Sequence, residues 1–121
     1  MSKEDTLQFL LSKVVEFRDE RGWKKYHNPK DLAVSISIEA AELLELFQWR
    51  SYDEISRLVQ KRDFICKVKR EMADIFIYLL SLADVLNIDL KEAVIEKLKE
   101  NAGKYPVEKV YGEKFKETLN N

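Results

Sequence analysis

Four acidic side chains, arranged as two pairs with the same spacing, are the residues of this sequence best suited to chemistry. Glu39 and Glu42 lie three positions apart in an apolar stretch, and Glu71 and Asp74 repeat that spacing. Because an α-helix turns by about 100° per residue, the members of each pair lie on one face of a helix. Carboxylates at a helix interface lose hydration, and like charges raise each other's pKa. Two such pairs facing each other are therefore costly unless a cation lies between them.

Magnesium is the cation that such a site favours. Mg²⁺ combines one or two carboxylates with water and substrate phosphates, and facing helices of a bundle can supply the carboxylates. The sequence predicts that the following residues bind Mg²⁺, or Mn²⁺ as a substitute: Glu39, Glu42, Glu71 and Asp74. The alternative is that both pairs are solvated surface residues of a catalytically silent helical interaction module.

Hydrophobic periodicity predicts helices for most of the chain. The expected helices cover residues 3–21, 29–50, 51–61, 63–86 and 89–101, and the tail from residue 105 has weak periodicity. Gly22, Asn87 and Gly103 are expected to end three of them. The predicted fold is all-α: an antiparallel helical bundle of four main helices plus a short helix. It forms one domain over residues 1–121, with a core at about 5–110 and a C-terminal tail at about 107–121.

The apolar content is high for a chain of this length. Residues 72–86 are apolar almost all round, so this segment is expected to be thoroughly buried. The helices expected at 29–50 and 63–86 are apolar on more than one face. We therefore expect homo-oligomerisation to complete the bundle.

Composition and charge exclude several classes of partner. The chain has 21 basic and 22 acidic side chains and a net charge of −1, so its global field does not attract nucleic acid. A single cysteine, Cys66, leaves no internal disulfide. No stretch approaches the roughly 20 apolar residues of a membrane span, and no signal peptide precedes the first helix. These features predict a cytoplasmic protein without a membrane or nucleic-acid partner.

The acidic pairs and the segments around them resemble a known family. E-A-A-E at 39–42 and E-M-A-D at 71–74 resemble the signature of MazG-type nucleotide pyrophosphohydrolases, and in particular the small dCTP pyrophosphatase-like branch. The stretch at 18–32, E-L-F-Q-W at 45–49, D-I-F-I-Y-L at 74–79 and N-A-G-K-Y-P at 101–106 are similar to other blocks of that branch. The resemblance covers roughly residues 5–110.

The resemblance implies an all-α fold that dimerises, often into a dimer of dimers, and an enzyme that hydrolyses a nucleoside triphosphate. The products are the monophosphate and pyrophosphate, and the implied substrate is dCTP or a modified pyrimidine deoxynucleotide. Metal-activated water attacks the α-phosphorus, and Glu39 or Glu42 is the catalytic base or positions the water. The resemblance also assigns all four acidic residues as metal ligands.

Substrate contacts are expected from basic and aromatic side chains. The resemblance favours a phosphate-binding role for Lys97, Asn101, Lys104 and Tyr105, whose spacing alone is more typical of a solvated helix face with a turn. Trp23, Trp49 and Tyr78 are the candidates for contacting the base, with Tyr26 and His27 nearby, and Lys24 and Lys25 are further candidates for substrate binding. For Trp49 and Tyr78, packing inside the fold is the alternative role.

Two related activities stay open beside the silent module. Phosphoribosyl-ATP pyrophosphatases and dimeric dUTPases share acidic helical metal sites. Val14 lies where a polar histidine lines the base pocket in the mammalian branch, so the preferred base also stays open.

Overall fold

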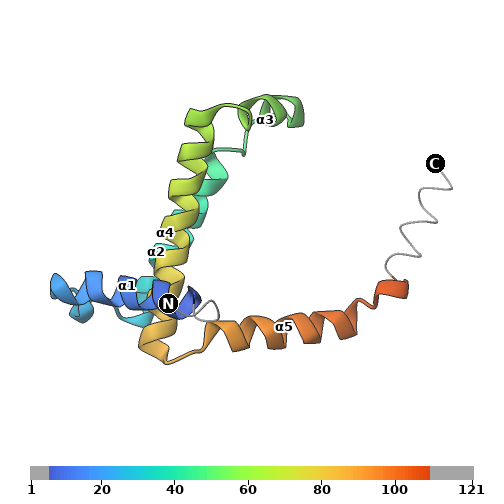
Figure 1. Ribbon diagram of the computed structural model, residues 1–121. Helices are drawn as coiled ribbons and strands as arrows, with labels where there is room; N and C mark the ends of the chain where they lie inside the picture. The colour runs from blue at the N-terminus through green and yellow to red at the C-terminus, as the bar shows by residue number, and fades with distance from the viewer. Residues whose placement is uncertain (1–5, 110–121) are drawn as a thin grey trace. The chain divides into compact units, whose positions relative to one another are not determined.

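A computed structural model describes residues 6–109, and within that range every regular element is a helix (Figure 1). The chain forms two compact units, Met1–Ile88 and Asp89–Asn121. The first contains α1 (Thr6–Glu20), the short 3₁₀ helix η2 (Lys24–Tyr26), α2 (Pro29–Glu45), α3 (Tyr52–Leu58) and α4 (Arg62–Leu86). The second contains α5 (Leu90–Lys104). The predicted all-α class is confirmed, whereas the single domain stays a prediction.

Side-chain caps mark where α2 and α3 begin. The Asn28 side chain accepts a hydrogen bond from the Asp31 backbone N–H at 2.9 Å, ahead of Pro29 in the first turn of α2. Ser51 caps α3 in the same way, through the Glu54 N–H at 3.2 Å. α2 ends at Glu45 and a turn follows, so the predicted end near residue 50 was wrong by about one turn.

Helices α2 and α4 form an antiparallel pair, which is the centre of the first unit (Figure 1). Phe47, just after α2, contacts Phe64 in the first turn of α4 edge to face, with ring centroids 5.5 Å apart. Leu32 near the start of α2 and Leu80 near the end of α4 are both buried. Residues 46–61, which include α3, connect the two long helices and let them run in opposite directions (Figure 1).

Residues in the left-handed backbone conformation end two of the helices, as predicted. Gly22 has φ +62° just after α1, and Asn87 has φ 54° as the C-cap of α4. Gly103 does not stop α5, which continues to Lys104, so that prediction was wrong. Gly103 has no positive φ, and a glycine costs a helix only about 1 kcal/mol relative to alanine, which neighbouring turns can tolerate.

A buried arginine joins α1 to α4. Arg18 is 3% exposed, and its guanidinium donates to Asp84 Oδ2 at 2.7 Å and to Asp19 Oδ1 at 3.0 Å. The Arg18 carbonyl accepts from the Trp23 N–H at 3.0 Å. Burial lowers the pKa of Arg18, but the hydrogen bonds and charges of the two aspartates outweigh it and raise the pKa overall. This residue therefore fixes both the helix crossing and the start of the loop that contains η2.

The expected burial of residues 72–86 is wrong for the single chain. Leu80, Ser81 and Ala83 are buried, but exposed apolar side chains also occur along this part of α4: Met72, Phe76, Ile77, Leu79 and Leu86. The reason is that only α1 and α2 pack against α4 extensively, so one side of it is uncovered. None of the helices between residues 6 and 109 has the length and apolar character needed to cross a membrane.

Candidate metal centre

Three glutamates converge where α2 faces α4. Glu39 and Glu42 lie one turn apart on α2, and Glu71 lies on α4. One carboxylate oxygen from each of the three lies within 4.8 Å of the others. We call these residues the glutamate trio. Their spacing matches oxygen atoms arranged around one divalent ion, for which metal–oxygen distances of about 2.0–2.6 Å are typical.

The trio has buried polar atoms that lack a partner. Among the described residues, Glu39 Oε2 and Glu71 Oε2 are buried and have no hydrogen-bond partner. An unsatisfied buried oxygen is costly, and two close carboxylates are more costly if both are charged. A cation would satisfy both atoms and offset the repulsion, so the residues present fit a hard divalent metal.

The pKa values of the trio reflect this crowding. The pKa of Glu39 is raised to about 7, first by burial and then by the neighbouring Glu42 carboxyl, Asp74 and Glu71, in that order of importance. The pKa of Glu71 is also raised, first by burial and then by Glu42. Without a metal, part of the trio is therefore protonated near neutral pH.

Asp74 is close to the trio without belonging to it. Its negative charge contributes to the raised pKa of both Glu39 and Glu71. Its carboxylate is not among those that converge within 4.8 Å, and its side chain is exposed. The assignment of Asp74 as a metal ligand therefore stays a prediction. It requires the Asp74 carboxylate to turn toward the trio when metal or substrate binds.

The raised pKa of Glu39 predicts how the stability of the metal-free chain depends on pH. Because that pKa is about 7 in the folded chain and ordinarily 4.5, the folded state holds a proton that the unfolded state has released. Stability then falls as pH rises from about 4.5 to 7. In chelator, urea unfolding should show this fall in the wild type and a smaller one in Glu39→Gln. Equal slopes in both proteins would contradict the prediction.

The predicted base-contacting loop lies beside α1. Trp23 packs edge to face on Phe17 with centroids 5.8 Å apart, and it remains 44% exposed. Lys24, Lys25 and Tyr26 form η2 and are exposed. The loop thus presents an accessible aromatic and basic surface.

His27 follows η2 and is half-buried. Its Nδ1 is buried without a hydrogen-bond partner among residues 6–109. Burial and then the Arg18 charge lower the pKa of His27, so the ring is neutral at physiological pH. A neutral imidazole can accept or donate one hydrogen bond, which is compatible with the predicted substrate contact.

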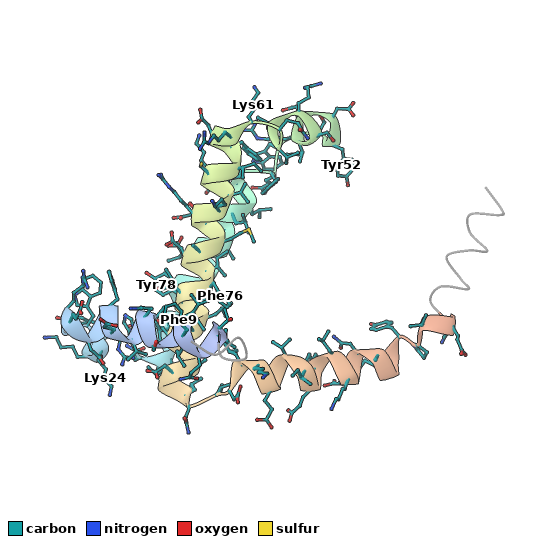
Figure 2. All side chains as sticks on the ribbon, viewed as in Figure 1. Phe9, Lys24, Tyr52, Lys61, Phe76 and Tyr78 are labelled. Carbon is teal, nitrogen blue, oxygen red and sulfur yellow. The ribbon has the colours of Figure 1, made fainter. Side chains whose placement is uncertain are left out.

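The two other aromatic candidates differ in environment. Tyr78 lies on α4 one turn beyond Asp74 and is half-buried (Figure 2). Trp49 lies in the turn after α2 and is 87% exposed. The packing role considered for Trp49 is therefore absent in the single chain.

The predicted phosphate-binding residues all belong to the second unit. Lys97, Asn101 and Lys104 lie along one side of α5, and Tyr105 is its C-cap. A residue that the sequence analysis missed lies between them: Glu100 Oε1 is 3.2 Å from Lys97 Nζ and 3.4 Å from Lys104 Nζ. The i,i+3 and i,i+4 spacings of these charges were the available signal.

The fold and the glutamate trio define a class of protein: all-α proteins with an acidic candidate metal site between two antiparallel helices. Comparison with known proteins identifies the family. A family model described as MazG-like matches residues 34–117. This chain therefore belongs to the MazG-like family.

Individual relatives are similar over most of the chain. Mouse dCTP pyrophosphatase 1 is 37% identical over 106 residues, which are 88% of this chain and 62% of the mouse protein. Human dCTP pyrophosphatase 1 is 34% identical over 105 residues, or 87% of this chain and 62% of the human protein. The chain thus spans less than two thirds of the length of these two relatives. A crystal structure of a pyrophosphatase from Archaeoglobus fulgidus is 54% identical, with a TM-score of 0.76, and the match covers 83% of this chain and 92% of that one.

Proposed function

We propose that this protein is a Mg²⁺-dependent nucleoside triphosphate pyrophosphohydrolase that acts on dCTP or a modified pyrimidine deoxynucleotide. The observation that carries the proposal is the glutamate trio, with its unpartnered buried oxygens and 4.8 Å convergence. Membership of the MazG-like family and the names of the relatives, dCTP pyrophosphatase 1 and a pyrophosphatase, support it. We also assign the enzyme to the cytoplasm.

In the proposed reaction, water attacks the α-phosphorus. The bond between the α-phosphorus and the oxygen that bridges it to the β-phosphorus breaks. The monophosphate gains the water oxygen, and pyrophosphate leaves. Glu39 or Glu42 positions the water and accepts its proton. Bound Mg²⁺ would neutralise phosphate charge and lower the pKa of water.

The remaining candidate residues are assigned to the two ends of the substrate. Trp23 and Tyr78, with Trp49, Tyr26 and His27, provide flat or polar groups for the base. Lys24 and Lys25 contribute positive charge beside them. Lys97, Asn101, Lys104 and Tyr105 are assigned to the triphosphate, where ammonium and amide groups donate to phosphate oxygens.

Self-association is part of the same proposal. The apolar side chains of α4 that remain exposed, including Met72 and Ile77, would be costly in water over so large a continuous helix face. Val34, Ile38 and Leu44 are exposed on α2 as well. A homodimer or a dimer of dimers would cover these residues. Light scattering coupled to gel filtration should give the mass of a dimer or tetramer, and a 14.3 kDa monomer would contradict it.

Glu100 is expected to compete with substrate phosphate for the two lysines of α5. Because its carboxylate pairs with Lys97 and Lys104, Glu100→Gln should free both ammonium groups. An exposed pair contributes at most about 1 kcal/mol, so KM should fall two- to fivefold with kcat little changed. Glu96→Gln, which removes a charge from the same helix, is the control and should leave KM unchanged. A higher KM in Glu100→Gln would overturn this role.

A substrate panel tests the proposed function. Pyrophosphate release is measured with dCTP, dUTP, dATP, dGTP, 5-methyl-dCTP and phosphoribosyl-ATP, each with and without Mg²⁺. The proposal predicts Mg²⁺-dependent release with a pyrimidine deoxynucleotide as the best substrate. Preference for dUTP or phosphoribosyl-ATP would assign a related activity. Absence of both turnover and calorimetric binding of Mg²⁺ with a non-hydrolysable nucleotide would favour the silent module.

A further inference from the structure

A basic cavity lies in the first unit, at the connection between α3 and α4. Its volume is about 490 Å³. It is lined by Arg50, Leu58, Lys61, Arg62, Asp63, Phe64 and Lys67. Figure 2 shows Lys61 at this turn, at the end of α4 remote from Tyr78. None of these residues belongs to the glutamate trio or to the predicted substrate contacts.

The lining of this cavity is strongly basic, although the whole chain is slightly acidic. Four cationic side chains, from Arg50, Lys61, Arg62 and Lys67, face one carboxylate, that of Asp63. Within residues 6–109, none of the four cations is in an ion pair. Like charges gathered around a concave surface repel one another and raise the local concentration of anions. The cavity therefore offers more positive charge than the described residues neutralise.

Its geometry suits a compact anion. Phe64 is buried and forms a fixed floor, and the Arg50 guanidinium lies 6.0 Å from the centre of its ring. A guanidinium held over an aromatic ring keeps its N–H groups free for oxygen ligands. The first turn of α4 lines the same cavity, and Lys61, its N-cap, makes no side-chain cap hydrogen bond. The backbone N–H groups of that turn add partial positive charge.

We propose that this basic cavity is a second anion site, which binds a small phosphate-bearing molecule independently of the metal centre. Arg62 is nine residues from Glu71 on the same helix, or about 13 Å along its axis. A phosphate group in the cavity therefore cannot contact the glutamate trio directly. Arg50, Arg62 and Lys67 donate hydrogen bonds to the phosphate oxygens, and Leu58 and Phe64 provide the apolar wall.

The test measures binding of inorganic pyrophosphate to the whole chain by calorimetry in chelator. Without a metal, the glutamate trio repels this anion, so binding reports on basic groups alone. The expected result is one pyrophosphate bound per wild-type chain. The double variant Arg62→Ala/Lys67→Ala should raise the dissociation constant at least about tenfold. The matched control is Arg57→Ala/Lys69→Ala, which removes one arginine and one lysine from α3 and α4 outside the cavity and should change binding less than twofold.

Variants of α5 distinguish the basic cavity from the lysines assigned to the substrate. Lys97→Ala/Lys104→Ala should weaken pyrophosphate binding in chelator less than the cavity variant does, and loss of binding there but not in the cavity variant would overturn the proposal. So would absence of binding at millimolar pyrophosphate. If Arg62→Ala/Lys67→Ala loses its helical circular dichroism, Arg62→Gln replaces it. A non-hydrolysable dCTP analogue run in parallel distinguishes a nucleotide site, with tighter binding than pyrophosphate, from a site for phosphate alone.

Discussion

Replacing Glu39 by glutamine is expected to abolish pyrophosphate release while leaving the helical fold intact. Glutamine has the size and shape of glutamate but no charge, so it weakens a metal ligand and removes a proton acceptor together. The loss of several kcal/mol of charge stabilisation corresponds to at least about a hundredfold decrease in kcat/KM. The measurement is pyrophosphate release at saturating Mg²⁺, with circular dichroism to verify the fold.

Variants of the other acidic residues distinguish a metal site of three carboxylates from one in which Asp74 is a fourth ligand. Glu42→Gln and Glu71→Gln should match Glu39→Gln, because all three carboxylates converge within 4.8 Å. Asp74→Asn should also abolish turnover if Asp74 is the fourth ligand. Glu16→Gln, on the exposed surface of α1, is the control and should retain full activity. Wild-type rates in the trio variants would remove the metal-site assignment.

Replacing Arg18 by methionine is expected to cause the largest loss of stability of any single change on α1. Methionine fills much of the same volume but leaves Asp84 without its partner at 2.7 Å. Removing one member of a buried, hydrogen-bonded ion pair typically costs about 3–5 kcal/mol. Asp84 is 31% exposed, so water compensates in part and the lower end of that range is expected.

Urea unfolding at a fixed chain concentration measures this change, since self-association would make stability depend on concentration. Arg21→Met is the matched control. Arg21 is 41% exposed and pairs loosely with Glu20 at 3.7 Å, so less than about 1 kcal/mol is expected. An equally small effect for Arg18→Met would show that the Arg18–Asp84 pair does not hold α1 on α4.

The sequence was most informative where local chemistry determines structure. Asn28, Ser51 and Asp89 each cap a helix through a backbone N–H three residues later, and this pattern can be read from the sequence. The spacing of Glu39 and Glu42 likewise predicted a shared helix face. The convergence of that face with Glu71 was inferable because consecutive long helices of a bundle tend to pack antiparallel.

The features that were missed depend on contacts distant in sequence. Arg18 and Asp84 are 66 residues apart, and no local pattern distinguishes either from a surface charge. The exposure of Met72 and Ile77 could not be foreseen either, because hydrophobic periodicity shows that a helix face needs a cover but not whether the same chain provides it. Spacing alone also cannot determine which carboxylates of a pair point to the same spot, as Asp74 illustrates.

Hydrolysis of dCTP in ¹⁸O-labelled water with Mg²⁺ tests the central claim most directly. Mass spectrometry of the products should find one ¹⁸O atom in the monophosphate and none in the pyrophosphate, and chelator should stop the reaction. Label in released pyrophosphate or phosphate, or formation of the nucleoside diphosphate, would contradict attack at the α-phosphorus. Turnover that continues in chelator would contradict a metal held by Glu39, Glu42 and Glu71.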